Sequence, residues 1–236
     1  MIIAEAISAK DRDDVYRFRY RVYVEEMRRH QTWADHSNKR ITEPLDASGH
    51  IFAAYNTANE IVGTVRLNVG ADENFGIYTE LYQLRSFGPF FPENVSITTK
   101  LMVAPEHRIS RLALDLAIAC YRRGLELRTC FDCIDCNQHL LRFFRRLGYR
   151  QLWPEIEHPE YGKVVPLVLV MNDFEHLSAV RSPFAPIAAG PRGELDSVEF
   201  FKRIQDRAPG VAARSGLSMC NVRAVRRTFA YSTHQV

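Results

Sequence analysis

The sequence predicts an α/β domain with a mixed central sheet flanked by helices, followed by a C-terminal extension. Short β-rich runs alternate with helical patterns over residues 1–175, which is the order typical of a sheet covered by helices. Prolines and glycines then concentrate between residues 183 and 193, and this composition indicates a linker. We therefore divide the chain of 236 residues into an α/β domain at 1–175 and an extension at 176–236.

The N-terminal half of the domain predicts a strand, a helix and a β-hairpin. Asp11 or Asp13 would begin the helix, because a short carboxylate side chain can accept hydrogen bonds from the first free backbone N–H groups. Two β-rich runs separated by a few polar residues indicate the hairpin. The expected elements are a strand at Ile2–Ile7, a helix that runs through Val24, and hairpin strands at His50–Tyr55 and Ile61–Asn68.

The second half predicts a long loop followed by alternating strands and helices. Residues 71–94 contain two glycines and two prolines, so we expect a functional lid or a mobile insert there. Pro166 would place the last strand at a sheet edge or at a bulge. The expected elements are strands at Val95–Val103, Cys130–Cys136 and Val164–Met171 and helices at Ser110–Arg128, His139–Leu147 and Asp196–Arg207.

The composition is that of a globular protein and excludes several classes. Hydrophobic residues make up 46% and charged residues 25%, an ordinary balance for a protein with a core. The net charge of +3 is too small to favour nucleic acid as a partner. We expect a cytoplasmic protein, because the sequence shows neither a signal peptide nor a run of roughly 20 apolar residues.

Three cysteines and a histidine have a spacing that superficially resembles a metal-binding run. Successive side chains of a strand point to opposite faces, so Cys133 would point away from Cys130 and Cys136. A metal site needs ligands that converge, and the sequence has no second cluster that would complete one with His139. We therefore assign no metal and interpret these cysteines as small apolar residues that pack a central strand.

The segment Leu101–Ala119 is the most informative part of the chain. A hydrophobic strand leads through a sharp turn into a helix, whose free N–H groups and dipole suit a phosphate or pyrophosphate. Within it, Arg108-Ile109-Ser110-Arg111-Leu112-Ala113 resembles the acyl-donor loop of the GNAT acyltransferases, with Arg111 in place of the central glycine. Downstream, Asn137 and the run Phe143–Tyr149 resemble the second half of the GNAT signature.

This resemblance implies a GNAT fold with an acyl-donor site. Backbone N–H groups near Met102 and Val103 would stabilise the oxyanion formed in thioester aminolysis, since preorganised donors favour the developing charge. Val103 is therefore a catalytic candidate. Many acetyl-CoA-dependent GNAT enzymes have a tyrosine acid at the position of Phe144, and that acid is absent here. The implied donor-binding residues are Met102, Val103, Arg108, Ser110, Arg111, Leu112, Ala113 and Asn137.

The N-terminal half narrows the resemblance to the N-acyl amino acid synthases and the acyl-homoserine-lactone (autoinducer) synthases. Both are GNAT relatives that take long acyl chains, typically from acyl carrier protein. The lactone synthases carry a glutamate in the stretch that corresponds to Ile97–Lys100, and its absence here makes the N-acyl amino acid synthases the better match. The matching positions are Arg19, Val22, Tyr23, Trp33, Glu43, Asp46 and Arg66.

These matches suggest an acceptor site and an acyl pocket. Glu43 and Asp46 are candidates for the base that deprotonates the amine; alternatively, they bind the amine or Arg66 electrostatically. A buried arginine is costly unless it is paired. Arg19 and Arg66 therefore either contact a carboxylate-bearing acceptor or form a structural ion pair with the two acidic residues. The remaining candidates for the acceptor or acyl pocket are Tyr23, Trp33, Lys100 and Phe144.

The sequence therefore predicts an N-acyltransferase that moves a long acyl group from the phosphopantetheine thioester of an acyl carrier protein to the amine of an amino acid or similar small acceptor. No cofactor would be bound permanently, and acyl-ACP or acyl-CoA would be the co-substrate. An acetyl-CoA-dependent N-acetyltransferase and a non-catalytic acyl-donor-binding module stay open as alternatives. The basic side chains expected to dock the acidic carrier protein are Arg122, Arg123, Arg142, Arg145 and Arg146.

The extension ends in a basic tail. Residues 207–236 contain five arginines and no acidic residue. The sequence leaves three interpretations open: a cover over the acyl pocket, a peripheral contact with an anionic membrane surface, and a disordered tail.

Overall fold

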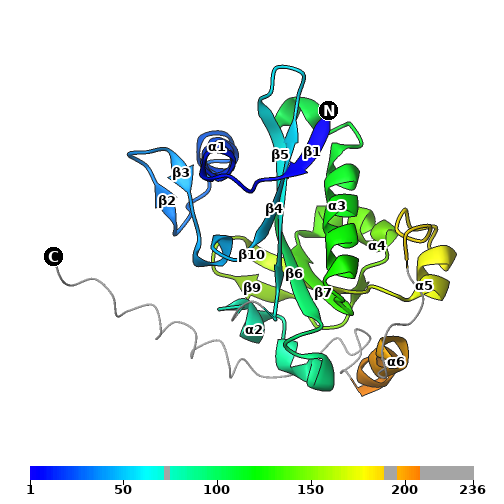
Figure 1. The fold of residues 1–236 in the computed structure, drawn as a ribbon. Helices are drawn as coiled ribbons and strands as arrows, with labels where there is room; N and C mark the ends of the chain where they lie inside the picture. The colour runs from blue at the N-terminus through cyan, green and yellow to red at the C-terminus, as the bar shows by residue number, and fades with distance from the viewer. Residues whose placement is uncertain (72–74, 189–195, 208–236) are drawn as a thin grey trace, which may run out of the picture.

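The computed structural model describes residues 1–71, 75–188 and 196–207. Within them, eight strands form a central sheet in the order β1-β4-β5-β6-β7-β10-β8, with β9 paired to β10. Figure 1 shows helix α1 and the small hairpin β2–β3 on one face of this sheet and helix α3 on the other. The predicted mixed sheet flanked by helices is therefore confirmed.

The strands of the sheet are β1 (Ile2–Glu5), β4 (His50–Tyr55), β5 (Ile61–Val69), β6 (Val95–Val103), β7 (Phe131–Cys136), β8 (Arg150–Gln151), β9 (Ile156–His158) and β10 (Gly162–Val170), and the separate hairpin is β2 (Ala34–Asp35) with β3 (Arg40–Ile41). The helices are α1 (Ala9–Tyr20), α2 (Tyr78–Leu81), α3 (Leu112–Glu126), α4 (Leu141–Leu147), α5 (Phe174–Ala179) and α6 (Ser197–Arg207).

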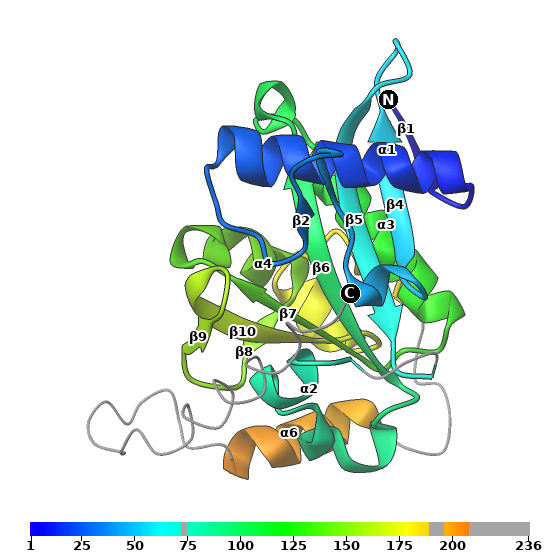
Figure 2. The ribbon, with the colours of Figure 1, turned by 90° about the vertical axis from the view of Figure 1, so that its left-hand side faces the viewer.

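The sheet opens in its middle, between β6 and β7. These two neighbours are parallel, whereas the other pairs in the sheet are antiparallel. Their pairing is confined to Val95–Ile97 beside Phe131–Cys133, although both strands continue further. Figure 2 shows β4, β5 and β6 on one side of this opening and β7, β10 and β8 on the other. The opening leaves backbone groups of β6 free to bind a ligand.

Ser8 caps helix α1, which begins at Ala9, so the predicted cap at Asp11 or Asp13 was wrong by about one turn. The hydroxyl of Ser8 accepts a hydrogen bond from the backbone N–H of Asp11 at 3.1 Å. In return, the backbone N–H of Ser8 donates to the Asp11 carboxylate at 3.3 Å. This capping box satisfies two N–H groups that the first turn leaves free. The helix continues into a π-helical turn at Arg21–Glu26, which carries Tyr23.

Helix α3 packs closely on β5 because a glycine stands at the point of contact. A Cβ atom added to Gly63 would lie 2.9 Å from the Leu116 side chain, closer than van der Waals contact allows. The helix buries Leu112, Leu116 and Cys120 in one core cluster with β4 and β5. This packing holds the N-terminus of α3 beside the opening of the sheet.

The segment 71–94 is not the long loop that its glycines and prolines predicted. Its described part contains α2 and a 3₁₀ segment at Leu84–Phe90. It buries five aromatic side chains in one core cluster with strand β7: Phe75, Tyr78, Tyr82, Phe87 and Phe90. The ring centroids of Phe87 and Phe131 are 4.7 Å apart. Tertiary packing of aromatic side chains therefore orders a stretch whose local signals indicate a loop.

Strand β10 lies inside the sheet, so the prediction that Pro166 marks an edge or a bulge was wrong. Pro166 pairs with Asp135 of β7 on one side. On the other side, β9 pairs with β10 up to Val164 and β8 begins to pair at Leu167. Pro166 therefore falls between two short partner strands, where a missing N–H donor removes no ladder hydrogen bond on that side.

The described part of the extension packs against the domain. The ring of Phe184 stacks on Tyr121 of α3 with centroids 4.2 Å apart. Helix α6 buries Phe201, over which the Arg150 guanidinium lies at 4.3 Å. The basic tail at 208–236 lies outside the described residues. No helix of the described ranges is long and apolar enough to cross a membrane.

Candidate acyl-transfer cleft

A β-bulge in β6 sets the geometry of the site. Thr64 pairs with Met102 but Arg66 pairs with Thr99, so β6 has one residue more than β5 between these positions. Lys100, in this extra stretch, has a φ of +56°. The left-handed conformation costs a non-glycine residue roughly 1–3 kcal/mol and is kept where the surroundings enforce it. Bulges redirect side chains, and this one brings Lys100 to the opening of the sheet.

The opening between β6 and β7 holds a cleft of about 590 Å³. This volume falls in the range of about 300–1,000 Å³ that small-molecule sites occupy. One part of its wall is polar and aromatic and includes Tyr23, Tyr82, Lys100, Asp135 and Tyr161. The other part is apolar and includes Leu101, Ala113, Leu114, Ile134, Leu140, Phe143 and Phe144.

The backbone N–H and C=O groups of Val103 point away from β5, towards the opening of the sheet. The N–H of Ala104 donates to the carbonyl of Val62 at 2.8 Å. Alternate residues of an antiparallel pair turn their N–H and C=O away from the partner strand, so those of Val103 face away from β5. The carbonyl oxygen of Val103 accepts a hydrogen bond from Arg108 Nε at 3.2 Å. Val103 and Met102 both line the cleft.

The predicted donor loop lies at the edge of the cleft, at the N-terminus of α3. Ser110 Oγ donates to the carbonyl of His107 at 2.6 Å and accepts from the backbone N–H of Leu112 at 3.2 Å. Arg108 is tied to Glu26 by an ion pair of 2.7 Å. Arg111 instead points to solvent, where it pairs with Asp115 at 3.0 Å. The loop therefore has a fixed shape and offers a helix N-terminus to an anion.

Five charged side chains form a buried network beside the cleft: Arg19, Glu43, Asp46, Arg66 and Lys100. Asp46 is 2.8 Å from a guanidinium nitrogen of both Arg19 and Arg66. Glu43 lies 3.0 Å from Arg66 and also pairs with Lys100. Gly49 makes room for this arrangement, because a Cβ there would lie 2.8 Å from the Arg66 side chain. The network joins the N-terminal segment to β5 and β6.

The pairing keeps both acids of the network ionised. Burial by itself would raise the pKa of Asp46, but the guanidinium groups of Arg19 and Arg66 outweigh it and lower the pKa to about 2. Burial likewise opposes ionisation of Glu43, while Lys100 and Arg66 bring its pKa below the ordinary value. Neither acid lines the cleft. Low basicity and lack of access make both poor proton acceptors, and the structure favours the electrostatic alternative for them.

Sequence reasoning missed the groups that complete the polar wall. Lys100 Nζ donates to the Tyr161 hydroxyl at 2.8 Å, and the Tyr161 ring stacks on His158 with centroids 4.4 Å apart. The Tyr82 hydroxyl donates to Asp135 at 2.8 Å. Burial raises the pKa of Asp135 above its ordinary value. The one signal for Asp135 in the sequence is an acidic residue in the apolar run of a central strand, which is costly without a purpose.

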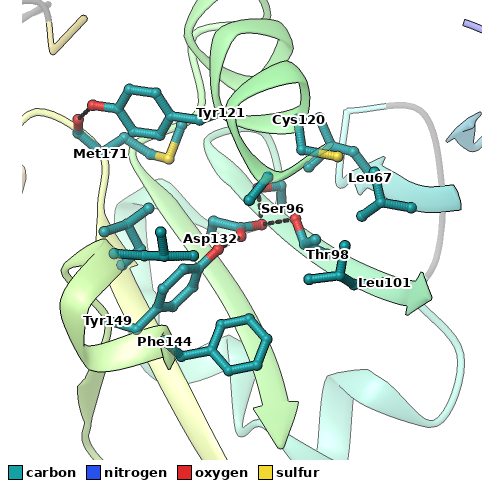
Figure 3. Close-up of a pocket in the computed structure, with 14 residues that line it drawn as sticks. Leu67, Ser96, Thr98, Leu101, Cys120, Tyr121, Asp132, Phe144, Tyr149 and Met171 are labelled. Atoms are coloured by element: carbon teal, nitrogen blue, oxygen red, sulfur yellow. Dashed lines mark hydrogen bonds between the residues drawn. The ribbon is translucent and has the colours of Figure 1, made fainter. Parts of the chain in front are cut away.

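A second, smaller cavity of about 20 Å³ lies behind the apolar wall (Figure 3). It shares Thr98, Leu101 and Phe144 with the cleft. At its polar side Asp132 accepts hydrogen bonds from the hydroxyls of three residues, Ser96 at 2.7 Å, Thr98 at 3.1 Å and Tyr149 at 2.5 Å. Burial raises the pKa of Asp132 to about 6 against these three bonds. The rest of the lining is mostly aliphatic.

The structure brings most of the predicted site residues to one place. Those that line the cleft are Tyr23, Lys100, Met102, Val103, Arg108, Ser110, Ala113, Asn137 and Phe144. Arg19, Glu43, Asp46 and Arg66 stand behind Lys100 in the buried network. Trp33 is 49% exposed and does not line the cleft, and Leu112 packs in the core under α3.

The basic side chains of α4 lie next to the cleft. Arg142, Arg145 and Arg146 are exposed, while His139, Leu140 and Phe143 from the same short segment line the cleft. On β7, Cys133 and Cys136 pack into core clusters on different sides of the strand, as strand alternation predicts.

Comparisons with solved structures show the same fold at low sequence identity. TofI, in a ternary complex with an inhibitor and MTA, superposes with a TM-score of 0.59 at 17% identity, covering 78% of this chain and 97% of TofI. BjaI, a CoA-dependent acyl-homoserine lactone synthase with SAM and isopentyl-CoA, gives 0.58 at 16%, with 84% and 95% covered. FeeM, an N-acyl amino acid synthase from uncultured soil microbes, gives 0.58 at 14%, with 73% and 97% covered.

A family model agrees with the fold. The search of curated proteins found no match. The model described as N-acyl amino acid synthase FeeM matches residues 14–173, which is most of the α/β domain and more than half of the chain. The matched region includes the bulge of β6, the cleft, the donor loop and the buried charge network. The chain therefore belongs to the N-acyl amino acid synthase FeeM family and is an acyltransferase with the GNAT fold.

Proposed function

We propose that this enzyme moves a long acyl group from the phosphopantetheine thioester of an acyl carrier protein to the amine of an amino acid or similar small acceptor. The observation that carries the proposal is the two-sided cleft between β6 and β7. Its apolar wall suits an acyl chain, its polar wall suits a charged acceptor, and the backbone of Val103 lies at the edge between strand and donor loop.

The donor loop supports binding of a phosphopantetheine arm. Its phosphate would meet the N-terminus of α3, where free N–H groups and the helix dipole favour an anion. Ser110 and Ala113 line the cleft beside this terminus, which leaves a path from the loop to β6. Acyl carrier proteins are acidic, and the exposed arginines of α4 lie next to that path, on the segment whose Leu140 and Phe143 line the cleft. Charge complementarity of this kind steers association.

The free backbone of β6 supports the chemical step. A thioester carbonyl placed beside Val103 could accept a hydrogen bond from its N–H, which points away from β5. The same N–H would hold the oxyanion that forms when the amine attacks. Preorganised donors of this type contribute several kcal/mol to acyl transfer, on the order of 3 kcal/mol for one donor.

The apolar wall and the inner cavity support a long acyl chain. A chain that enters along Ala113 and Leu114 would run towards Phe144 and Leu101, which separate the cleft from the cavity in front of Asp132. Each buried methylene group contributes about 0.8 kcal/mol. An acetyl group would leave most of this surface without a partner.

The experiment uses the purified full chain with acyl carrier proteins that carry single chain lengths, a panel of amino acids, and mass spectrometry of the products. We expect N-acyl amino acids, with a higher kcat/KM for an acyl carrier protein than for the coenzyme A thioester of the same chain. Ala113→Phe should block the arm and abolish product, whereas Arg40→Ala, at an exposed position that does not line the cleft, should not. Product from acetyl-CoA alone, or no acylated product from folded enzyme, would overturn the proposal.

A further inference from the structure

The polar wall of the cleft contains one acid among several bases. Among the described residues that line the cleft, Asp135 is the acidic side chain, and Arg29, Lys100, Arg108 and His139 are the basic ones. A single carboxylate in such surroundings is a natural partner for an ammonium group, provided that no protein cation already neutralises it.

Asp135 meets that condition, unlike the acids of the buried network. Its hydrogen-bond partner is the neutral hydroxyl of Tyr82 at 2.8 Å, and none of the ion pairs found within the described residues includes it. Glu43, by contrast, is held between Arg66 and Lys100. Burial also makes Asp135 more basic than an ordinary aspartate, because it raises the pKa of the carboxyl.

The position of Asp135 places it across from the bulge of β6. It follows by two residues the last residue of β7 that pairs with β6, Cys133. Strand alternation turns Asp135 to the same face as Cys133, which packs with α2, and turns Ile134 and Cys136 to the face of α3 and α4. Strand β7 therefore has Asp135 on the acceptor side and Ile134 and Cys136 on the acyl side.

Arg29 is the matching cation. Its guanidinium carbon lies 5.7 Å from the ring centroid of Tyr161, on the polar wall that also contains Lys100 and Asp135. Lys100 is paired with Glu43 and Arg108 with Glu26. For Arg29, the part of the chain that the structure describes contains no ion-pair partner. A guanidinium group free to bind two oxygens in a plane suits a carboxylate.

We propose that Asp135 binds the ammonium group of the amino-acid acceptor and removes its proton, and that Arg29 binds the acceptor's carboxylate. This inference rests on the proposed function and assigns the acceptor half of the same cleft. The aromatic rings of Tyr23 and Tyr161 lie on the same polar wall, with centroids 5.8 Å apart, and would pack against the acceptor's carbon skeleton.

The proposed reaction removes two protons from the acceptor nitrogen. Asp135 takes one proton from the ammonium, and the freed lone pair of nitrogen forms the C–N bond to the thioester carbon while the carbonyl electrons move to oxygen. When the oxyanion collapses, the C–S bond breaks, and the thiolate takes a second proton from nitrogen. Asp135 releases the first proton to solvent. The products are an amide, a thiol and one proton.

Other titratable groups surround Asp135 and shape its pH response. Tyr78 and Tyr82 face it from the α2 segment, Lys100 from β6 and His158 from β9, while Cys136 follows it on β7 and points to the opposite face. His158 and Lys100 favour the ionised form of Asp135, while burial opposes it more strongly. The activity should therefore fall on the acid side at a pH above the ordinary range for an aspartate.

The test compares Asp135→Asn with Asp173→Asn, which removes another buried carboxylate, at the start of α5, that does not line the cleft. Removal of a general base typically costs 10²–10⁴-fold, so we expect Asp135→Asn to lower kcat at least 100-fold. The fall of kcat at acid pH should be absent from this variant. Its rate should instead rise steadily with pH, because a larger fraction of the amine is deprotonated in solution. Binding of a fluorescent acyl donor and the thermal midpoint, measured on the same samples, report whether the variant folds. Asp173→Asn should retain the fall of kcat at acid pH.

Arg29→Ala tests the carboxylate contact. We expect KM for the amino acid to rise at least tenfold while kcat changes little, and the wild-type preference for an amino acid over its amide should disappear. Folded Asp135→Asn enzyme with an unchanged kcat and an unchanged fall of kcat at acid pH, or Arg29→Ala enzyme with an unchanged preference, would overturn the inference while leaving the proposed function in place. If the wild-type enzyme made no N-acyl amino acid, the proposed function itself would fail.

Discussion

Asp132 and Asp135 lie three residues apart on β7 and face opposite sides of the sheet. Asp132 accepts hydrogen bonds from Ser96, Thr98 and Tyr149 beside the inner cavity. Asp135 accepts one from Tyr82 beside the polar wall of the cleft. One strand thus places a buried carboxylate on the acyl side and another on the acceptor side. Asp132, which accepts three hydrogen bonds, is therefore a structural acid. Asp135, which accepts one, is the accessible acid.

The pH dependence of stability should reveal Asp132. Its pKa in the folded protein is about 6, whereas an unfolded aspartate has a pKa of about 3.9. The folded state therefore binds more protons between these values, and the contribution of Asp132 to stability falls as the pH rises from about 4 to about 6. Asp132→Asn should remove up to about 3 kcal/mol of this pH-dependent change. Urea unfolding at pH 4, 5, 6 and 7 measures it; parallel curves for the two proteins would contradict the assignment.

The buried network should be far more sensitive to mutation than the surface ion pairs. Asp46→Asn leaves Arg19 and Arg66, both 0% exposed, without their shared partner, and breaking a buried pair costs about 3–5 kcal/mol. Asp14→Asn, the control, removes the exposed pair with Lys10 and should cost less than about 1 kcal/mol. The free energy of unfolding from urea titrations tests both. Equal losses in the two variants would show that the network does not stabilise the fold.

Local signals in the sequence were sufficient for the regular elements near the site. Apolar periodicity located α3, and β-rich runs located β4, β5 and β6 within a few residues. The short elements between residues 75 and 90 could not be found in this way. They depend on Tyr82, Phe87 and Phe90 packing against β7, and such contacts between distant parts of the chain leave no period in the sequence.

The candidate site was predictable only in part, for a related reason. Resemblance to a family identified Tyr23, Lys100 and Val103, which the structure places in the cleft. Asp135 and Tyr161 lie in stretches without any motif, and they reach the polar wall because β7 and the β9–β10 turn fold onto the bulge of β6. Trp33 matches the family pattern by residue type, but its side chain is half exposed and lies outside the cleft.

Phe144 should limit the length of the acyl chain. Its ring lies between the cleft and the inner cavity and belongs to the lining of both, so Phe144→Ala should join the two spaces. We expect the variant to prefer chains longer than those of the wild type by two or more carbons, measured by mass spectrometry with an equimolar mixture of donors. Phe184→Ala, which removes a buried ring stacked on Tyr121 behind α3, should cost stability without changing the preferred length. If Phe144→Ala preferred acyl chains of the same length as the wild type or shorter, the acyl chain would not run past Phe144.

The arginines of α4 should act on the carrier protein and not on the thioester. Reversing Arg142, Arg145 and Arg146 to glutamate should lower kcat/KM for an acyl carrier protein at least tenfold at low salt, because steering by complementary charge changes association rates by about 10–10³-fold. Added salt should narrow the gap between variant and wild type, since it screens exposed charges. With an acyl-pantetheine donor, which has no protein surface, the two should be alike. Arg203→Glu on α6, where the side chain is 63% exposed and pairs with Glu199, should behave as wild type with both donors. Equal losses with acyl-pantetheine and with the carrier protein would instead mean that the arginines support the cleft itself.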